Sequence, residues 1–111
     1  MQITFKFGYP LIKRTYRRTG NINTTTVHTF IQILGKYPDT LVQRIHGESV
    51  AATVSRRARN IVGQGGMLTD AGRVLVGKFD RELRGKDINP GTTADLTASS
   101  LMLAIIDGLR P

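Results

Sequence analysis

Apolar residues recur along this chain with the spacing of a helix. The clearest case follows Asn23, where they occupy positions i, i+3, i+4 and i+7: Val27, Phe30, Ile31 and Leu34. This spacing places all four side chains on one face of an α-helix. Alternation of apolar and polar residues, which marks a half-buried strand, is nowhere sustained. The pattern predicts an all-α fold.

Capping and turn residues divide the chain into about five predicted helices. These run from Pro10 to Gly20, from Asn23 or Thr24 to Gly35, from Asp39 or Thr40 to Gly63, from Thr69 or Asp70 to Gly85, and from Thr92 to Leu109. The third contains Gly47, and a glycine inside a helix costs about 1 kcal/mol relative to alanine. Gly47 indicates either a kink or the close approach of another helix or a ligand, and we favour close approach.

The last predicted helix is apolar on almost every side. One face carries Ala94, Ala98, Leu101, Met102, Ile105 and Leu109, and much of the rest is Leu96, Leu103 and Ile106. Such a helix is usually central and buried. Short links between amphipathic helices then predict an antiparallel bundle packed around it. Because four companions of this size give it too few neighbours, we expect the chain to be part of a larger helical domain.

The length and composition fit one cytoplasmic domain. A chain of 111 residues holds a single core, so we expect one helical domain, 1–111. There is no cysteine, which excludes disulfides, thiolate zinc sites and a cysteine nucleophile and fits a reducing compartment. No apolar run approaches the roughly 20 residues that span a bilayer, and the first residues lack the pattern of a signal peptide. We therefore expect no membrane partner.

The charge favours an anionic partner. Sixteen Lys and Arg against eight Asp and Glu give a formal net charge of +8, so nucleic acid, nucleotides and an acidic protein are candidates. Two clusters carry much of this charge: Lys13, Arg14, Arg17 and Arg18, and Arg56, Arg57 and Arg59. Each cluster either faces solvent or contacts phosphate. Tyr16 is the one aromatic residue inside either cluster, too few for the surface on which single-stranded nucleic acid stacks, so nucleic acid is the less favoured partner.

Two predicted helix starts pair a threonine with an aspartate. Asp39 and Thr40 follow a proline, and the last helix opens with the segment Asn89-Pro90-Gly91-Thr92-Thr93-Ala94-Asp95. The first turn of a helix presents unpaired N–H groups and a partial positive charge. The second start is therefore a candidate phosphate site, and both starts could meet on one ligand. The alternative is that Asp39 caps one helix while Thr92 and Asp95 form a capping box on the other.

Several polar residues follow Asp39 within two or three helical turns: Arg44, His46, Gly47 and Glu48. Helical spacing places Arg44 beside Glu48, either at a site or as a surface ion pair. His46 and His28 each fit a structural role better than a role as ligand or acid. No cluster with metal-ligand spacing, nucleophilic serine motif or P-loop is present. From the residues alone the chain is a basic, helical anion binder.

Three segments carry a resemblance to a known family. They are Gly20 to Leu34 (GNINTTTVHTFIQIL), Pro38 to Gly47 (PDTLVQRIHG) and Asn89 to Gly108 (NPGTTADLTASSLMLAIIDG). Together they resemble the triphosphoribosyl-dephospho-coenzyme A synthase family, in register from about Phe7 to Leu109. The resemblance is to the C-terminal half of the family's catalytic domain. It implies that an N-terminal half is absent from this sequence.

The resemblance implies an all-helical transferase for prosthetic-group biosynthesis. Its substrates would be ATP and 3′-dephospho-coenzyme A, which it would join with release of adenine. For this chemistry we assign Asp39 and Asp95 as catalytic carboxylates or as ligands of a magnesium ion. Substrate contacts are assigned to Thr40, Arg44, His46 and Gly47 in the first motif and to Gly91, Thr92 and Thr93 in the second, where the three N–H groups would form a phosphate cradle.

Two other hypotheses stay open. The chain could be a non-enzymatic basic helical module that binds nucleic acid or an acidic partner, in which case its affinity would fall steeply with salt. It could instead act only with a separate N-terminal half or as a homo-oligomer, and be inactive alone. That hypothesis predicts exposed apolar surface on the isolated chain.

Overall fold

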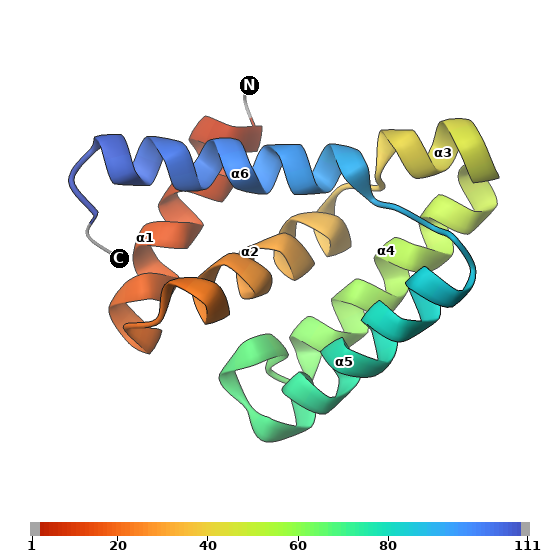
Figure 1. Ribbon diagram of the computed structural model, residues 1–111, viewed down its shortest axis with the longest axis horizontal. Coiled ribbons are helices and arrows are strands. Elements are labelled where there is room, and N and C mark those ends of the chain that lie inside the picture. Colours follow the sequence, from red (N-terminus) through yellow and green to blue (C-terminus); the bar gives the residue numbers. More distant parts are fainter. Residues whose placement is uncertain (1–2, 110–111) are drawn as a thin grey trace.

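The computed structural model describes residues 3–109 and confirms the all-α fold (Figure 1). Six α-helices follow one another: α1 (Tyr9–Thr19), α2 (Ile22–Lys36), α3 (Thr40–His46), α4 (Glu48–Gly63), α5 (Asp70–Gly85) and α6 (Gly91–Ile106). A π-helix, η1 (Thr4–Gly8), runs directly into α1, and a 3-10 turn, η2 (Gly66–Leu68), links α4 to α5. Within residues 3–109 there is no strand, and no helix there is long and apolar enough to cross a membrane.

The main core lies between α2, α4 and α5. It is a cluster of buried apolar side chains: Ile31, Leu34, Val54, Ala58, Ile61, Phe79 and Leu83. The central helix is α2, which contacts α1, α4, α6 and η2. Side chains of α4 also donate hydrogen bonds to backbone carbonyls in the last turn of α2. Ser55 Oγ donates to the Leu34 carbonyl at 2.8 Å. Arg59 Nη1 donates to the Gly35 carbonyl at 2.8 Å.

The prediction that the last helix is central and buried is wrong. α6 lies against α1, α2 and η1 (Figure 1) and buries only one strip of side chains: Thr93, Thr97, Ser100 and Ala104. Much of the predicted apolar face is open to solvent instead, with Met102 63% and Ile105 40% exposed. The helix thus packs through its small and hydroxyl-bearing residues and leaves large apolar ones outside.

Internal hydrogen bonds explain why this polar strip can be buried. Thr97 Oγ1 donates to the Thr93 carbonyl at 2.8 Å, and Ser100 Oγ donates to the Leu96 carbonyl at 2.8 Å. A buried hydroxyl that has a partner costs little. Small side chains also permit close packing, because a Cβ added at Gly8 of η1 would lie 2.0 Å from Ser100 Oγ. Hydrophobicity alone therefore indicates the wrong face of α6.

The predicted third helix is two helices, because the chain breaks at Gly47. Gly47 has φ +97° and ψ 163°, a conformation that residues with a side chain rarely adopt. Its N–H donates to the Gln43 carbonyl at 2.9 Å, and its carbonyl accepts from Ala51 N–H at 3.2 Å. The same residue thus ends α3 and begins α4. No atom of another element lies within 4 Å of a Cβ added there, so the predicted close approach of another helix is wrong and Gly47 marks a kink. Close approach of a ligand stays a prediction.

Two of the predicted helix caps are confirmed. Asp39 caps α3, and Thr69 caps α5. The cap of α2 lies earlier than predicted, because Asn21 Oδ1 accepts the N–H of Thr24 at 2.9 Å. An asparagine in extended conformation directly before a helix is a favoured cap, and it competes here with Asn23 two residues later.

A surface cluster ties the end of α6 to α1. Tyr9 Oη donates to the carboxylate of Asp107, and Lys13 Nζ donates to the same oxygen at 3.0 Å. These hydrogen bonds, that from Tyr9 foremost, lower the pKa of Asp107, and the Asp107 carboxylate raises the pKa of Lys13. Exposed ion pairs contribute little stability. The cluster therefore links the residue after α6 to α1 and adds little to the stability of the fold.

Candidate functional site

The helices α3 and α6 begin side by side (Figure 1). The hydroxyl groups of Thr40 and Thr92, 52 residues apart in the sequence, form a hydrogen bond of 2.9 Å. Gly91 permits this approach, because a Cβ added there would lie 2.8 Å from Leu41 Cδ2. Folding thus brings together the two motifs that the sequence singles out. We call this feature the paired helix starts, residues 39–42 and 91–93.

Asp39 joins the paired helix starts from the inside. The residue is 2% exposed. Its Oδ1 accepts the backbone N–H groups of Leu41 at 2.9 Å and Val42 at 3.0 Å, in the first turn of α3. Its Oδ2 accepts the N–H and the hydroxyl group of Thr93 in α6, both at 2.7 Å. A buried carboxylate is costly unless donors match it, and here each oxygen accepts two hydrogen bonds.

The Asp39 carboxylate occupies the place that the amino ends of helices offer to an anion. Two N–H groups of the predicted phosphate cradle are already bonded within the chain. Thr93 N–H donates to Asp39, and Gly91 N–H donates to the Asn89 carbonyl at 2.8 Å. The contacts give Asp39 a structural part. The assignments of Asp39 as base or magnesium ligand, and of a phosphate cradle at this helix start, stay predictions.

Asp95 lies on the exposed side of α6. It does not cap the helix, since α6 follows Pro90 without a side-chain cap, and the predicted capping box with Thr92 is wrong. No hydrogen bond or ion pair joins Asp95 to Asp39, both of which the structure describes. Within residues 3–109 no three or more His, Asp and Glu side chains gather where they could hold a metal ion. Asp95 is thus an accessible carboxylate close in sequence to the paired helix starts.

The remaining residues of the first motif lie on and after α3. Arg44 is exposed, and His46 is half-buried as the last residue of the helix. The break at Gly47 turns the chain before Glu48, so the helical spacing that would pair Glu48 with Arg44 is lost. No ion pair joins these two described residues. Arg44, His46 and Gly47 stay predicted substrate contacts at the surface.

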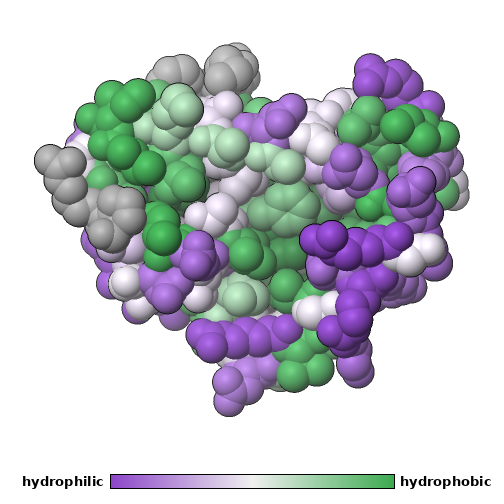
Figure 2. Space-filling model, viewed as in Figure 1, coloured by the Kyte–Doolittle hydropathy of each residue, from purple (hydrophilic) through white to green (hydrophobic). Residues whose placement is uncertain are grey.

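Sequence reasoning missed an apolar cleft of about 1130 Å³ between α2, α5 and α6. Figure 2 shows hydrophobic residues at the bottom of a hollow, with hydrophilic residues along part of its edge. We call it the α5–α6 cleft. Its apolar lining comes from all three helices: Val27, Phe30, Val76, Leu83, Ala98 and Leu101. One signal could have revealed it, the apolar face of the last helix that has too few neighbours.

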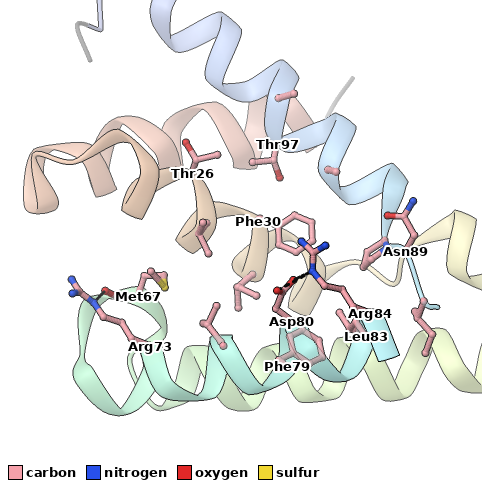
Figure 3. A pocket seen from close by; sticks show the side chains of 18 of the residues that line it. Thr26, Phe30, Met67, Arg73, Phe79, Asp80, Leu83, Arg84, Asn89 and Thr97 are labelled. Carbon is pink, nitrogen blue, oxygen red and sulfur yellow. Dashed lines mark hydrogen bonds and ion pairs between the residues drawn. The ribbon is translucent and has the colours of Figure 1, made fainter. Parts of the chain in front are cut away.

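Polar groups stand around this lining (Figure 3). Arg84 Nε pairs with the Asp80 carboxylate at 3.0 Å, one helical turn apart on α5. Arg73 Nε donates to the Met67 carbonyl at 2.9 Å. The amide of Asn89 lies at the other end, where the lining reaches the residues that precede α6. The cleft therefore ends beside the paired helix starts, although neither Asp39 nor Asp95 lines it.

His28 holds the turn at the far end of the cleft. Its Nδ1 accepts the backbone N–H of Met67 at 3.2 Å, which puts the proton of the neutral ring on Nε2. Nε2 lies beside the side-chain amide of Gln32, whose oxygen is the atom able to accept that proton. Burial lowers the pKa of His28, and the nearby charge of Arg18 lowers it further. A Cβ added at Gly66 would lie 2.6 Å from Nδ1. His28 is a structural residue here.

The basic cluster of α4, residues 56, 57 and 59, is largely bonded within the chain. Arg57 pairs with Glu82 of α5 and lies over the ring of Phe79, 5.1 Å from its centre. Arg59 is bonded to the end of α2. The Arg57 guanidinium lowers the pKa of Glu82. These contacts take two of the three arginines of α4 away from a phosphate-binding surface.

The chain belongs to a family of transferases. A sequence model of the ATP:dephospho-CoA triphosphoribosyl transferase family matches residues 1–111, the whole chain. The match confirms the resemblance seen in the sequence, and it does not favour the alternative of a non-enzymatic nucleic-acid-binding module.

Curated relatives carry the corresponding name. The chain is 30% identical over 95 residues to the 2-(5''-triphosphoribosyl)-3'-dephosphocoenzyme-A synthase of Klebsiella pneumoniae, covering 86% of this chain and 32% of that protein. It is 29% identical over 102 residues to a probable synthase of the same name from Pseudomonas fluorescens, covering 92% of this chain and 35% of that protein. The chain spans about a third of the length of these relatives. No solved structure matches it.

Proposed function

We propose that this chain is part of an enzyme that transfers the triphosphoribosyl group of ATP to 3′-dephospho-coenzyme A in the cytoplasm. The main support is the family match over residues 1–111. The structure adds one observation: the two motifs behind the resemblance meet at the paired helix starts, joined by Thr40 and Thr92 and by Asp39. Residues brought together from opposite halves of a chain are typical of a site rather than of local capping.

The reaction makes three demands on the protein. A ribose hydroxyl of the acceptor attacks the anomeric carbon of the ATP ribose, so a C–O bond forms, the C–N bond to adenine breaks and the hydroxyl proton passes to a base. The transition state carries positive charge on the sugar, which a carboxylate stabilises. Donors and cations must hold the triphosphate, and the site must exclude water, which would otherwise compete as acceptor.

The geometry divides these roles between the two aspartates. Asp95 is the accessible carboxylate, so we assign to it the base or the charge-stabilising group. Magnesium usually binds one or two carboxylates together with substrate phosphates, and Asp95 fits that mode. Asp39, whose oxygens each accept two hydrogen bonds, is a positioning residue that holds α3 and α6 together. The exposed Arg44 and the hydroxyl groups of Thr40 and Thr92 are assigned to the triphosphate.

Adenine release tests this proposal. The assay supplies ATP, magnesium and 3′-dephospho-coenzyme A to a chimera of the Klebsiella pneumoniae relative in which this chain replaces the segment that it matches. We expect Asp95→Asn to lower turnover by about 100-fold or more, the usual effect of losing an acid or base. The matched control is Asp70→Asn, since Asp70 is also exposed near the start of a helix. Adenine release by the Asp95→Asn variant at the parent's rate would overturn the role of Asp95. No adenine release by the folded parent chimera would overturn the proposed reaction.

A further inference from the structure

The α5–α6 cleft is lined like the inside of a protein. Valine, leucine and phenylalanine side chains of three helices meet there, and Val27 and Ala98 are exposed while Phe30, Val76 and Leu101 are only partly buried. Apolar surface of this extent on a soluble chain marks an interaction site. The two arginines beside it are bonded within the chain, Arg84 to Asp80 and Arg73 to the Met67 carbonyl.

The helix that forms one side of the cleft has little support of its own. α5 packs mainly on α4 and η2, and its side toward α6 is open. Opposite it, one helical strip of α6 runs out of the cleft along the surface: Ala94, Ala98, Leu101 and Ile105. These residues lie at i, i+4, i+7 and i+11, the spacing by which a helix presents one face to a partner helix. The uncovered surface therefore has the length and form of a helix-packing site.

We propose that the α5–α6 cleft receives an amphipathic helix from the part of the family fold that this chain does not contain. Relatives about three times as long supply the occupant, since the chain covers only 32% to 35% of them. The helix belongs either to the same polypeptide or to a separate one. The proposal rests on family membership and not on the catalytic roles given above.

Charge bears on which partner supplies that helix. The side chains that line the cleft carry both signs, Arg73 and Arg84 beside Asp80 and Asp87, so the cleft lining has no net charge. The whole chain, in contrast, has a formal charge of +8. A second copy carries the same charge, so two copies of this chain repel each other. The charge thus argues for the remainder of the family fold over a homodimer.

Thiol labelling tests the proposal, because the chain has no cysteine of its own. Ala98→Cys places a thiol in the cleft, and Ala52→Cys places one on the exposed side of α4, away from it. Both alanines are exposed in this chain. Maleimide labelling of each site is followed by peptide mass spectrometry, in the isolated chain and in the chimera with the Klebsiella pneumoniae relative. Circular dichroism shows that each variant is folded.

We expect equal labelling rates at the two sites in the isolated chain. In the chimera, labelling at position 98 should be about tenfold slower or more, since a packed helix must open before reagent enters, while labelling at position 52 is unchanged. Equal rates in the chimera would overturn the proposal, as would a chimera that does not fold. Slow labelling at position 98 in an isolated chain that sediments as a dimer would assign the cleft to a second copy instead. This experiment does not measure catalysis, so its result can be interpreted even if the proposed reaction is not observed.

Discussion

The paired helix starts and the α5–α6 cleft are neighbours, yet one is complete and the other is not. At the paired helix starts, each Asp39 oxygen accepts two hydrogen bonds from the same chain. In the cleft, large apolar side chains such as Val27, Phe30 and Leu101 remain at least partly exposed to solvent. The carboxylate of the first region has all its hydrogen-bond partners within this chain. The second region, by our proposal, is covered only when a partner helix packs on it. The difference indicates that the motif residues keep their arrangement without the remainder of the family fold.

Removing the buried carboxylate should have the largest effect. Asp39→Ala leaves the N–H groups of Leu41, Val42 and Thr93 without an acceptor, and we expect a loss of about 3 kcal/mol in the free energy of unfolding. Chemical denaturation of the isolated chain measures it. The control Asp95→Ala should change stability by no more than about 0.5 kcal/mol, because Asp95 is exposed. Equal losses of stability for the two substitutions would show that the Asp39 carboxylate does not hold α3 and α6 together.

Two adjacent threonines allow the buried and the exposed contacts of the paired helix starts to be compared. Thr93→Val removes a buried hydroxyl bonded to Asp39 and should cost about 1.5 kcal/mol. Thr92→Val removes only the exposed contact with Thr40 and should cost no more than about 0.5 kcal/mol. Thermal unfolding of the two variants side by side gives the difference. A larger loss for Thr92→Val would contradict the structural account.

Acid should loosen the far end of the cleft through His28. Its pKa is lower in the folded chain than the ordinary value of 6.5, so the unfolded state binds more protons between these two values. The stability that comes from the neutral ring is therefore complete above about pH 6.5 and is lost as pH falls through the lowered pKa. Unfolding measured from pH 8 to pH 5 should show this slope, and His28→Gln should reduce it. An unchanged slope would assign the pH dependence to other groups.

The smallest effect is expected inside the cleft. Ala98→Glu alters an exposed position, so the isolated chain should unfold within about 0.5 kcal/mol of the parent. In the chimera the same carboxylate would be buried against the apolar face of the proposed helix and lower the stability of the chimera, whereas Ala52→Glu would not. A loss of stability in the isolated chain would mean that the cleft is already covered there.

The residues of α6 show how much of the molecule its sequence reveals. Helix periods and the caps Asp39 and Thr69 follow from local chemistry and were predictable. The face that α6 buries was not, because Thr97 and Ser100 satisfy their hydroxyl groups within the helix and so pack like small apolar residues. The break at Gly47 depends on a rare backbone conformation that a glycine permits without requiring it.

The two regions of the site differ in the same way. The motifs that form the paired helix starts were visible in the sequence, and their meeting was predicted as a possibility. That Asp39 itself takes the anion position was not predictable, since it depends on the placement of Thr93 beside it. The cleft was indicated only by the excess of apolar residues in the last helix. Its position between α2 and α5 is a property of tertiary packing.

Amide hydrogen exchange tests the central claim most directly, by comparing the isolated chain with the chimera. The account predicts that the N–H groups of Leu41, Val42 and Thr93 are protected equally in both. The cleft side of α5, around Val76 and Leu83, should gain protection only in the chimera, where the proposed helix covers it. Protection of α5 that is the same in both proteins, or paired helix starts that become protected only in the chimera, would contradict the account.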